Sequence, residues 1–426
     1  MTTRRAVFSW CLYDWANSAF NTVIGTFVFS VYFARGIYGD ETAGSAVWGF
    51  ALGAAGLAVA LTSPVLGAIA DRGGARKPWL GIFVALTLLP TALLWFATPD
   101  RSMVPFALAC MVVASVAFEL ANVFYNAMLE DVAPPGKIGR VSGWAWGLGY
   151  AGGLGCLVVA LVGFIQPEQP LFGLSTEEAE NIRATAILVA LWFGLFAIPL
   201  FVFTPDQPAT GLPIRKVVIA GLAQLVQTLR DVRRYGDIVR FLIASALYRD
   251  GLATLFAMGG LYAAGTFGMD FEEILIFAIG LNVTAGLGAF GFAWLDDALG
   301  SKKTVFLALV GLIGFGTATL LISDKTVFIA LALGLGIFVG PAQAASRSLM
   351  ARLSPNEMET EMFGLYAFSG KSVAFIGPLA FALATEAFDS QRAGMATIMV
   401  SFLLGGAVLA FVREPTDSNA GSGASR

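Results

Sequence analysis

Long apolar segments recur along the whole chain, and most are close to the roughly 20 residues that cross a bilayer as a helix. The period-two alternation that marks the strands of a lipid-facing barrel is absent. Because helices satisfy their own backbone hydrogen bonds in lipid, the pattern predicts an all-α membrane protein with twelve transmembrane helices. The predicted spans are residues 8–34, 46–70, 79–98, 102–129, 142–165, 184–204, 238–265, 273–295, 303–322, 326–349, 361–386 and 392–412.

The composition also indicates a chain embedded in a membrane. Of its 426 residues, 57% are hydrophobic and only 13% are charged, whereas an ordinary soluble domain has about 25% charged residues. The chain has no histidine, and Cys11, Cys110 and Cys156 lie far apart. We therefore expect no disulfide framework, metal site, cofactor or histidine-based catalysis. The net charge of −3, with no basic run, argues against nucleic acid as a partner.

The distribution of basic residues predicts the orientation. With a cytoplasmic N-terminus, most of the 26 Lys and Arg residues fall in inner segments, whereas the acidic residues divide evenly. The positive-inside rule then places both termini in the cytoplasm. We expect a multi-pass protein of the plasma membrane if the chain is bacterial, or of the vacuolar membrane if it is fungal. We also expect that a monomer suffices for function.

The chain divides into two similar halves. Acid, glycine and a basic pair recur in Asp71 to Lys77 and in Asp297 to Lys303, at matching positions. A parallel repeat of six helices and six helices around a central loop is one arrangement of secondary transporters. The predicted parts are an N-terminal bundle (1–204), a cytoplasmic linker (205–237), a C-terminal bundle (238–412) and a disordered tail (413–426).

Several motifs resemble a known transporter family. The segment from Gly67 to Lys77 is similar to the major facilitator loop G-x-x-x-D-R-x-G-R-K, with Ala75 where an arginine is usual. Residue segments 13–20, 123–129, 343–348 and 363–371 resemble the vacuole-effluxer branch of this superfamily. The fungal members of that branch export amino acids from the vacuole after autophagy. The resemblance covers residues 8–412 and implies a major facilitator fold that moves amino acids by alternating access.

Polar residues inside the predicted helices form the candidate solute site. Each buried charge costs about 2.5–3.5 kcal/mol on an insertion scale, so these residues must face protein or water. Asp14, Asn17 and Asn21 share one helical face, and Glu119 repeats the pattern on helix four. The resemblance implies that helices 1, 4, 7 and 10 line a central cavity. The predicted cavity residues are Asp14, Asn17, Asn21, Glu119, Asn122, Tyr125, Asn126, Tyr248, Arg249, Asp250, Gln343, Arg347 and Lys371.

Opposite charges in this set suit a zwitterion such as an amino acid, with Arg249, Lys371 or Arg347 holding its carboxylate. Alternatively, the charges are structural ion pairs, such as Asp14 with Lys371, and Lys371 favours that interpretation because helix eleven flanks the cavity in the resembled family. A coupled proton would need Asp14, Glu119 or Asp250, and we favour Glu119, which has no basic neighbour in sequence.

The alternative functions are a proton-coupled exporter of another metabolite or drug and, in a different class, a membrane enzyme or a non-transporting sensor. We expect no enzyme, because the acids lie on separate helices and no nucleophile with a base is clustered.

The loops after helices two and eight are candidate gates. Asp71 can accept hydrogen bonds from a helix N-terminus, and the resemblance implies that this helix is the eleventh. Arg72 is expected to pair with Glu130 or Asp131, whereas Arg76 and Lys77 are interpreted as setting topology only. In the second half, Asp297 would act with Lys302 and Lys303. The predicted gating residues are Gly67, Asp71, Arg72, Gly74, Glu130, Asp131 and Asp297.

Two glycine motifs, at 147–152 and 286–291, match the dinucleotide fingerprint G-x-G-x-x-G. Neither follows a strand, so the phosphate-binding interpretation fails. Small residues let membrane helices approach closely. We therefore expect helices five and eight to pack together through Gly149, Gly152, Gly288 and Gly291.

Overall fold

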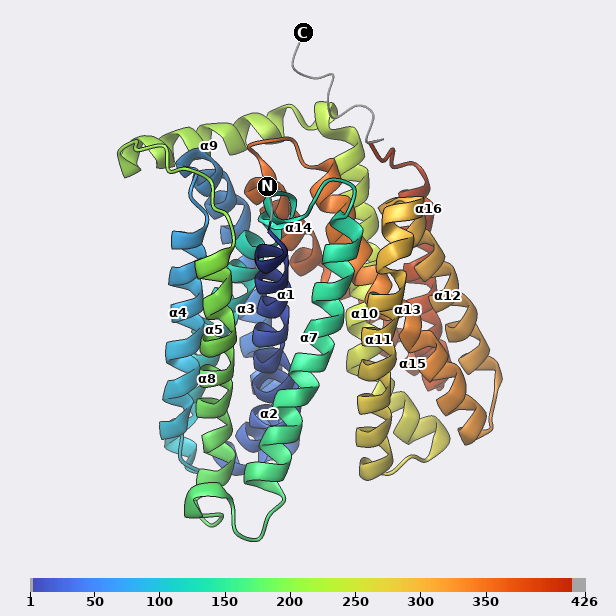
Figure 1. The fold of residues 1–426 in the computed structure, drawn as a ribbon. Coiled ribbons are helices and arrows are strands. Elements are labelled where there is room, and N and C mark those ends of the chain that lie inside the picture. The colour runs from blue at the N-terminus through green and yellow to red at the C-terminus, as the bar shows by residue number, and fades with distance from the viewer. Residues whose placement is uncertain (1–2, 416–426) are drawn as a thin grey trace. The chain divides into compact units, whose positions relative to one another are not determined.

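A computed structural model describes residues 3–415 of the chain (Figure 1). Within that range, twelve helices are long and apolar enough to cross a membrane, and no strand is present. The prediction of an all-α membrane protein is therefore confirmed. The spans are Arg4–Ile37, Glu41–Gly73, Lys77–Phe96, Arg101–Ala127, Ile138–Ile165, Glu180–Phe203, Val232–Phe267, Glu272–Leu299, Ser301–Leu321, Lys325–Leu353, Glu359–Phe388 and Gln391–Ala410.

The α-helices of the described residues have the following bounds. Those up to the central linker are α1 (Arg4–Ala19), α2 (Phe29–Tyr32), α3 (Glu41–Gly73), α4 (Lys77–Leu93), α5 (Val104–Ala127), α6 (Leu129–Val132), α7 (Ile138–Ala160) and α8 (Glu180–Phe203). Those that follow are α9 (Ile214–Arg230), α10 (Gly236–Phe267), α11 (Phe271–Leu299), α12 (Ser301–Leu321), α13 (Lys325–Leu353), α14 (Glu359–Val373), α15 (Ile376–Phe388) and α16 (Gln391–Ala410).

The first span is not a regular α-helix. It passes from α1 into π-helical turns at Phe20–Phe27, then through α2 into further π-helical turns at Phe33–Ile37. Such wide turns are rare in proteins, but those that do occur are often found at functional sites. Asn21 falls in the first of these segments and is exposed, whereas Asp14 and Asn17 on α1 are buried.

The eleventh span is broken into α14 and α15 at residues 374–375. The span Glu359–Phe388 agrees with the predicted span 361–386, but the sequence analysis did not anticipate the break within it. The physical reason is Pro378, which has no backbone N–H and whose ring clashes with the carbonyl four residues earlier, at Ala374. The chain therefore starts a new helix at Ile376.

The central linker contains the additional helix α9, and the next span begins at Val232, inside the predicted linker. At the other end of the chain, the Arg413 backbone N–H donates to Asp237 Oδ1 at 3.0 Å. Residues 416–426 of the predicted disordered tail lie outside the described part of the chain.

The chain forms two compact units. The first comprises residues 1–63, 74–132 and 148–211, and the second comprises 64–73, 133–147 and 212–426. In the first unit α1 packs on α8 and α4 on α5, and in the second α10 packs on α16 and α13 on both α11 and α12.

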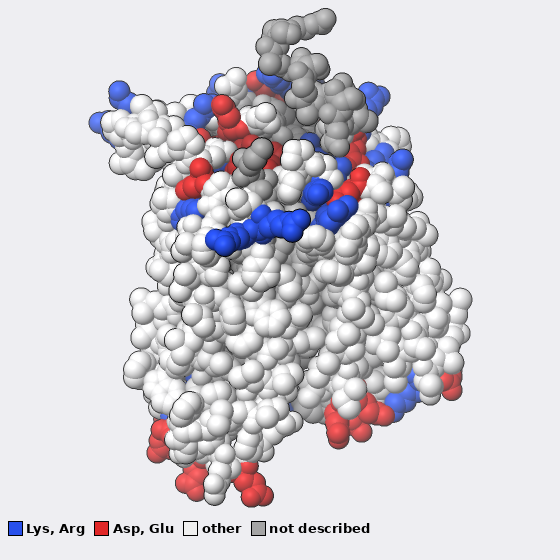
Figure 2. Space-filling view, viewed as in Figure 1, with Lys and Arg blue, Asp and Glu red and all other residues white. Residues whose placement is uncertain are grey.

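Apolar side chains cover the flanks of the spans within each unit. On α8, Leu191, Leu195 and Ile198 are exposed by 67%, 64% and 54% and lie on one face. Figure 2 shows Lys, Arg, Asp and Glu near the helix ends, with uncharged side chains between them. This distribution matches the environment of a bilayer, where the flanks meet hydrocarbon and the ends meet water.

Candidate functional site

Asp71, near the end of α3, holds the first turn of α14. Its Oδ1 accepts the Thr360 backbone N–H at 3.1 Å and its Oδ2 accepts that of Glu361 at 2.8 Å. A carboxylate there satisfies orphan donors and interacts favourably with the positive end of the helix dipole. The two helices meet closely, because a Cβ at Gly67 would overlap the Thr360 carbonyl. We refer to this arrangement as the first latch.

Asp297, at the end of α11, makes an equivalent contact with the first turn of α7, which we refer to as the second latch. Its Oδ1 accepts the Arg140 backbone N–H at 3.1 Å, and its Oδ2 lies 3.3 Å from the Arg140 guanidinium. The sequence analysis expected Asp297 to act with Lys302 and Lys303. Its observed basic partners are instead Arg140 and, at 3.9 Å, Arg352.

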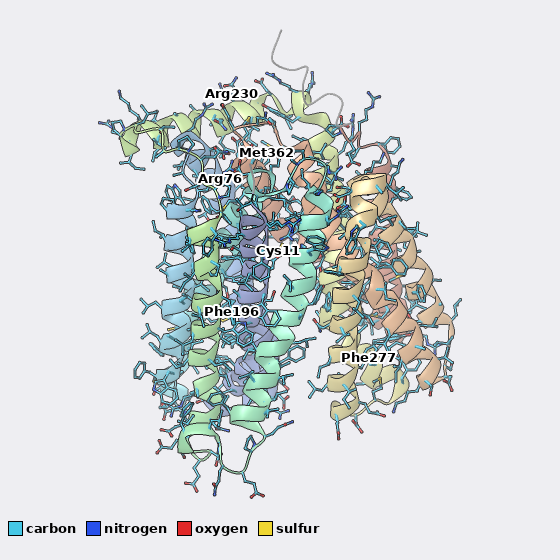
Figure 3. All side chains as sticks on the ribbon, viewed as in Figure 1. Cys11, Arg76, Phe196, Arg230, Phe277 and Met362 are labelled. Atoms are coloured by element: carbon cyan, nitrogen blue, oxygen red, sulfur yellow. The ribbon has the colours of Figure 1, made fainter. Side chains whose placement is uncertain are left out.

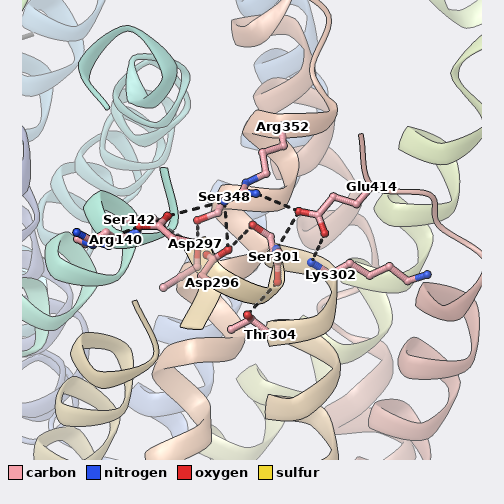
Figure 4. A network of polar contacts seen from close by, with 12 residues as sticks. Arg140, Ser142, Asp296, Asp297, Ser301, Lys302, Thr304, Ser348, Arg352 and Glu414 are labelled. Carbon is pink, nitrogen blue, oxygen red and sulfur yellow. Dashed lines mark hydrogen bonds and ion pairs between the residues drawn. The ribbon is translucent and has the colours of Figure 1, made fainter. Parts of the chain in front are cut away.

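A buried carboxylate that sequence reasoning missed supports the second latch (Figure 4). Asp296 is only 2% exposed and accepts a hydrogen bond from Ser301 Oγ at 2.5 Å. The Arg352 guanidinium lies 3.6 Å from Asp296 and 3.4 Å from Glu414. Asp296 and Asp297 are thus held by a shared arginine at the junction of α11, α12 and α13.

A second missed feature is a carboxylate that follows each half's last span and caps another helix. Asp206 accepts the backbone N–H groups of Arg76 and Lys77, at 2.9 and 3.2 Å, at the start of α4. Glu414 accepts those of Ser301 and Lys302, at 2.8 and 2.9 Å, at the start of α12. The available signal was an acid beside a proline directly after the span, in Pro205-Asp206 and Glu414-Pro415.

The interpretation that Arg76 and Lys77 only set topology is wrong. Arg76, which is labelled in Figure 3, is buried with 1% exposure and donates to Asp131 at 2.7 Å and to the Ala127 carbonyl at 3.0 Å. Lys77 Nζ donates to the carbonyls of Phe201, at 3.0 Å, and Thr204. Both side chains therefore tie the start of α4 to neighbouring spans.

The remaining predicted gating residues lie in the same loops. Gly74 adopts a left-handed conformation, with φ of 86°, and a Cβ there would overlap the Pro208 carbonyl. Arg72 is exposed and interacts electrostatically with Glu361. Its pairing with Glu130 or Asp131 stays a prediction.

In the first unit, α1 and α5 meet through polar side chains. Asn17 Nδ2 donates to Asn122 Oδ1 at 3.0 Å. One turn further along α5 and two turns back along α1, the Tyr125 hydroxyl donates to the Trp10 carbonyl at 3.0 Å, and the two rings stack with centroids 4.4 Å apart. Asp14 is 8% exposed beside this contact. Glu119 and Asn126 of α5 are half-buried. The structure thus brings Asn17 and Asn122 together, as two members of the predicted stripes.

In the second unit, α10 carries three predicted cavity residues in different surroundings. The Tyr248 hydroxyl lies 2.6 Å from Ser346 Oγ. The Arg249 guanidinium lies over the Tyr366 ring, 4.1 Å from its centroid, and donates to the Tyr366 carbonyl at 3.2 Å. Asp250 is 5% exposed and accepts a hydrogen bond from the Gly377 backbone at the start of α15, while its Oδ1 has no partner among residues 3–415.

On α13, Arg347 binds the first turns of α7. Its Nε donates to Ser142 Oγ at 2.9 Å and its Nη2 donates to the Ser142 carbonyl at 2.8 Å. The guanidinium also lies 5.5 Å from the Trp146 ring centroid. Two further predicted cavity residues of this unit, Gln343 and Lys371, are half-buried.

Helices five and eight approach each other closely, as predicted, but not through the four predicted glycines. A Cβ at Gly149 would lie 2.9 Å from Ser18 Oγ and one at Gly152 would overlap the Trp15 carbonyl, so these two glycines face α1. A Cβ at Gly288 would overlap the Ile337 carbonyl of α13, and one at Gly291 would meet no atom within 4 Å.

The contact between α7 and α11 within the second unit uses other glycines. A Cβ at Gly147 would lie 3.2 Å from the Gly286 carbonyl, and one at Gly143 would lie 2.7 Å from that of Ala289. The small residues were recognised correctly, but the face that meets each neighbour was not.

Twelve apolar spans, with a carboxylate latch repeated in two loops, define a multi-pass membrane protein. The family model described as "Major Facilitator Superfamily" matches residues 2–157. The model described as "Vacuole effluxer Atg22 like" matches residues 135–420. The chain therefore belongs to the Atg22-like vacuole effluxer family, which is a family of transporters rather than of enzymes.

Similar proteins occur in bacteria and fungi. YxiO of Bacillus subtilis, an uncharacterised MFS-type transporter, is 29% identical over 96% of this chain and 95% of its own length. Autophagy-related protein 22 of Yarrowia lipolytica is 24% identical over 86% of this chain and 74% of its own. The match to autophagy-related protein 22-2 of Aspergillus clavatus, at 23% identity, covers 62% of this chain but only 46% of that protein.

Solved structures share the fold. The proton:xylose symporter XylE aligns with a TM-score of 0.74 and 14% identity, over 97% of this chain and 96% of that one. The transporter FucP, in an outward conformation, aligns with a TM-score of 0.77 and 13% identity over 97% of this chain and all of that one. At such low identity the likeness concerns the fold alone.

Proposed function

We propose that this protein is a secondary active transporter that moves a small polar solute, most suitably an amino acid, by alternating access. Both chain termini and the latch loops are on the cytoplasmic side in this proposal, as the excess of basic residues in the inner segments favours. Membership of a family described as vacuole effluxers supports transport as the activity.

The observation that carries the proposal is the pair of latches. In each, a carboxylate at the end of one span binds backbone N–H groups in the first turn of another. Such contacts can open and reform without any covalent step, and helix shifts of this kind are a common form of conformational switching. We propose that the latches hold the cytoplasmic side closed and release when the transporter turns inward.

The charges on α10 support a zwitterionic solute. A buried carboxylate oxygen without a hydrogen bond costs about 1–3 kcal/mol or more, and Asp250 Oδ1 is such an atom within the described residues. An ammonium group would satisfy it. Arg249, the preceding residue, carries the complementary charge for a carboxylate, at present directed to the Tyr366 ring. In this proposal Asp250 binds the amino group and Arg249 the carboxyl group.

The test is counterflow into liposomes that contain the purified protein and unlabelled amino acids. We expect saturable uptake of labelled amino acids. Zwitterions should compete, whereas the matching amines without a carboxylate, carboxylic acids without an amine, and neutral sugars should compete weakly. Effective competition by sugars with none by amino acids would overturn the substrate class, and the absence of counterflow for all solutes would overturn transport.

The variant Asp250→Asn tests the residue. It should raise the concentration of amino acid needed for half-maximal uptake, because the neutral amide loses the attraction for the ammonium group. The matched control is Asp270→Asn, an exposed carboxylate that caps α11 by accepting the Glu273 N–H at 2.8 Å. Equal uptake by both variants would exclude Asp250 from the solute site.

A further inference from the structure

Helix α9 connects the latch region to a surface that the transport proposal does not use. One of its faces is buried. A Cβ at Gly221 would lie 2.6 Å from the Ile69 Cα of α3, and Gln224 Nε2 donates to Glu361 Oε2 at 2.5 Å, in the first turn of α14. This face therefore contacts both helices of the first latch, within two residues of Asp71 and at Glu361 itself.

A second face of α9 is apolar and exposed. Ile219, Leu222, Val226 and Leu229 are exposed by 58%, 42%, 46% and 58%. Their spacing of three, four and three residues places them in one stripe along the helix. Exposed leucines on a span are explained by lipid, but α9 is not one of the twelve spans. A contiguous apolar stripe on such a helix indicates an interaction surface.

The remaining sector of α9 carries small and polar side chains, among them Ala223 and Gln227, which are both exposed. Gln227 is next to Val226 in the sequence. The helix thus has three sides, of which one packs on protein, one is apolar and one carries small and polar side chains. Figure 1 shows it as a separate helix lying crosswise to α10. An amphipathic helix with this orientation suits the interface between hydrocarbon and headgroups.

The charges identify the chemistry of the partner. Five exposed basic residues flank the stripe. The segment from residue 212 to residue 235 contains only one acidic residue, Asp231. Basic side chains are visible at the end of this helix in Figure 2, and Arg230 is labelled in Figure 3. Clusters of basic residues beside a membrane span bind anionic lipids. The five residues are Arg215, Lys216, Arg230, Arg233 and Arg234.

We propose that α9 docks on an anionic leaflet of the membrane, with its stripe among the acyl chains and its basic residues on the lipid phosphates. The buried face then transmits the state of the membrane surface to the first latch through Ile69 and Glu361. This docking goes beyond the proposed transport and does not depend on which solute is carried.

The experiment compares two neighbouring positions in the full-length protein. Val226→Cys places a fluorophore on the stripe and Gln227→Cys places it on the sector of small and polar side chains. Both are made in a background whose three natural cysteines, which are buried, are alanine. Vesicles contain either phosphatidylcholine alone or a mixture with phosphatidylglycerol. Quenching is measured with spin-labelled lipid and, separately, with aqueous iodide.

In the vesicles with phosphatidylglycerol, we expect spin-labelled lipid to quench the probe at Val226 strongly and iodide to quench the probe at Gln227. The triple variant Arg230→Gln, Arg233→Gln, Arg234→Gln should reduce lipid quenching at Val226 to its level in phosphatidylcholine alone. High salt should have the same effect, because it screens the attraction.

Three results would overturn the proposal. The first is equal lipid quenching at Val226 and Gln227. The second is lipid quenching at Val226 that does not change with phosphatidylglycerol or with the triple variant. The third is a probe at Val226 that is shielded from both quenchers, which would indicate a protein partner or a second copy of the chain. Counterflow measured on the same vesicles shows that each variant is folded and keeps a failed docking result separate from a failed transport result.

Discussion

Loss of the Asp71 charge should shift the balance between the two accessible states of the transporter. In the first latch the two carboxylate oxygens accept two backbone N–H groups, at 3.1 and 2.8 Å. In the variant Asp71→Asn only one oxygen remains, the amide NH₂ group faces a donor, and the charge–dipole attraction is lost. Gly67 still permits close packing of α3 and α14, so the perturbation is confined to the polar contact.

The magnitude follows from these contacts. A hydrogen bond to a charged group contributes about 1.5–3 kcal/mol net, and a tenfold change in equilibrium corresponds to about 1.4 kcal/mol. If the latch closes only one state, losing one such bond shifts the equilibrium toward the open state by about 10- to 100-fold. Membrane insertion should be unchanged, because the positive charges that set topology remain in the loop.

The assay uses the substitution Asn126→Cys, at a half-buried position of α5, in both variants. A membrane-impermeant maleimide is applied from the cytoplasmic side, and the rate at which it labels this cysteine is measured. We expect faster labelling in Asp71→Asn. The control is Asp100→Asn, which removes the same kind of contact, from Asp100 Oδ1 to the Ser102 N–H at 2.7 Å, in an exposed turn. A labelling rate that is the same in both variants would refute the role of the latch.

Three further substitutions test other parts of the site. Asp206→Ala removes the cap of α4, so the melting temperature in detergent should fall by the equivalent of about 0.5–2 kcal/mol, with counterflow retained; an unchanged temperature would contradict this. A lysine cannot reproduce the two hydrogen bonds that the Arg347 guanidinium donates to Ser142. In Arg347→Lys, counterflow should therefore fall while expression and insertion stay normal. Full activity would mean that these two hydrogen bonds are dispensable. Glu119→Gln should abolish the dependence of transport on a pH gradient if Glu119 carries the coupled proton, and a retained dependence would transfer that role to Asp14 or Asp250.

The number and type of the spans could be predicted from the sequence because bilayer thickness fixes the length of an apolar helix. Individual irregularities were less visible. Pro378 was a sufficient signal for the break in the eleventh span, since a proline removes one backbone donor and displaces the carbonyl four residues earlier. The π-helical turns at Phe20–Phe27 have no comparable signal, because neither proline nor charge marks their start.

The candidate site shows the same division. Asp71 was predictable because a carboxylate can accept hydrogen bonds from a helix N-terminus, and the resemblance to the major facilitator loop implied that this helix is the eleventh. Arg76 was misjudged because a basic residue in a loop looks the same whether it is solvated or buried. Its burial depends on Asp131, far away in sequence, and on the space beside α5.

The sequence alone determined that this chain is embedded in a membrane and has twelve spanning helices, and it identified Asp71 as a carboxylate that caps a helix. These depend on local composition and on spacing along one helix. Only the tertiary structure decided which glycine meets which helix, that Asp206 and Glu414 cap α4 and α12, and that α9 lies on the first latch. The physical reason is that a helix with small or polar residues on several faces has several acceptable neighbours, and the packing of the whole unit selects among them.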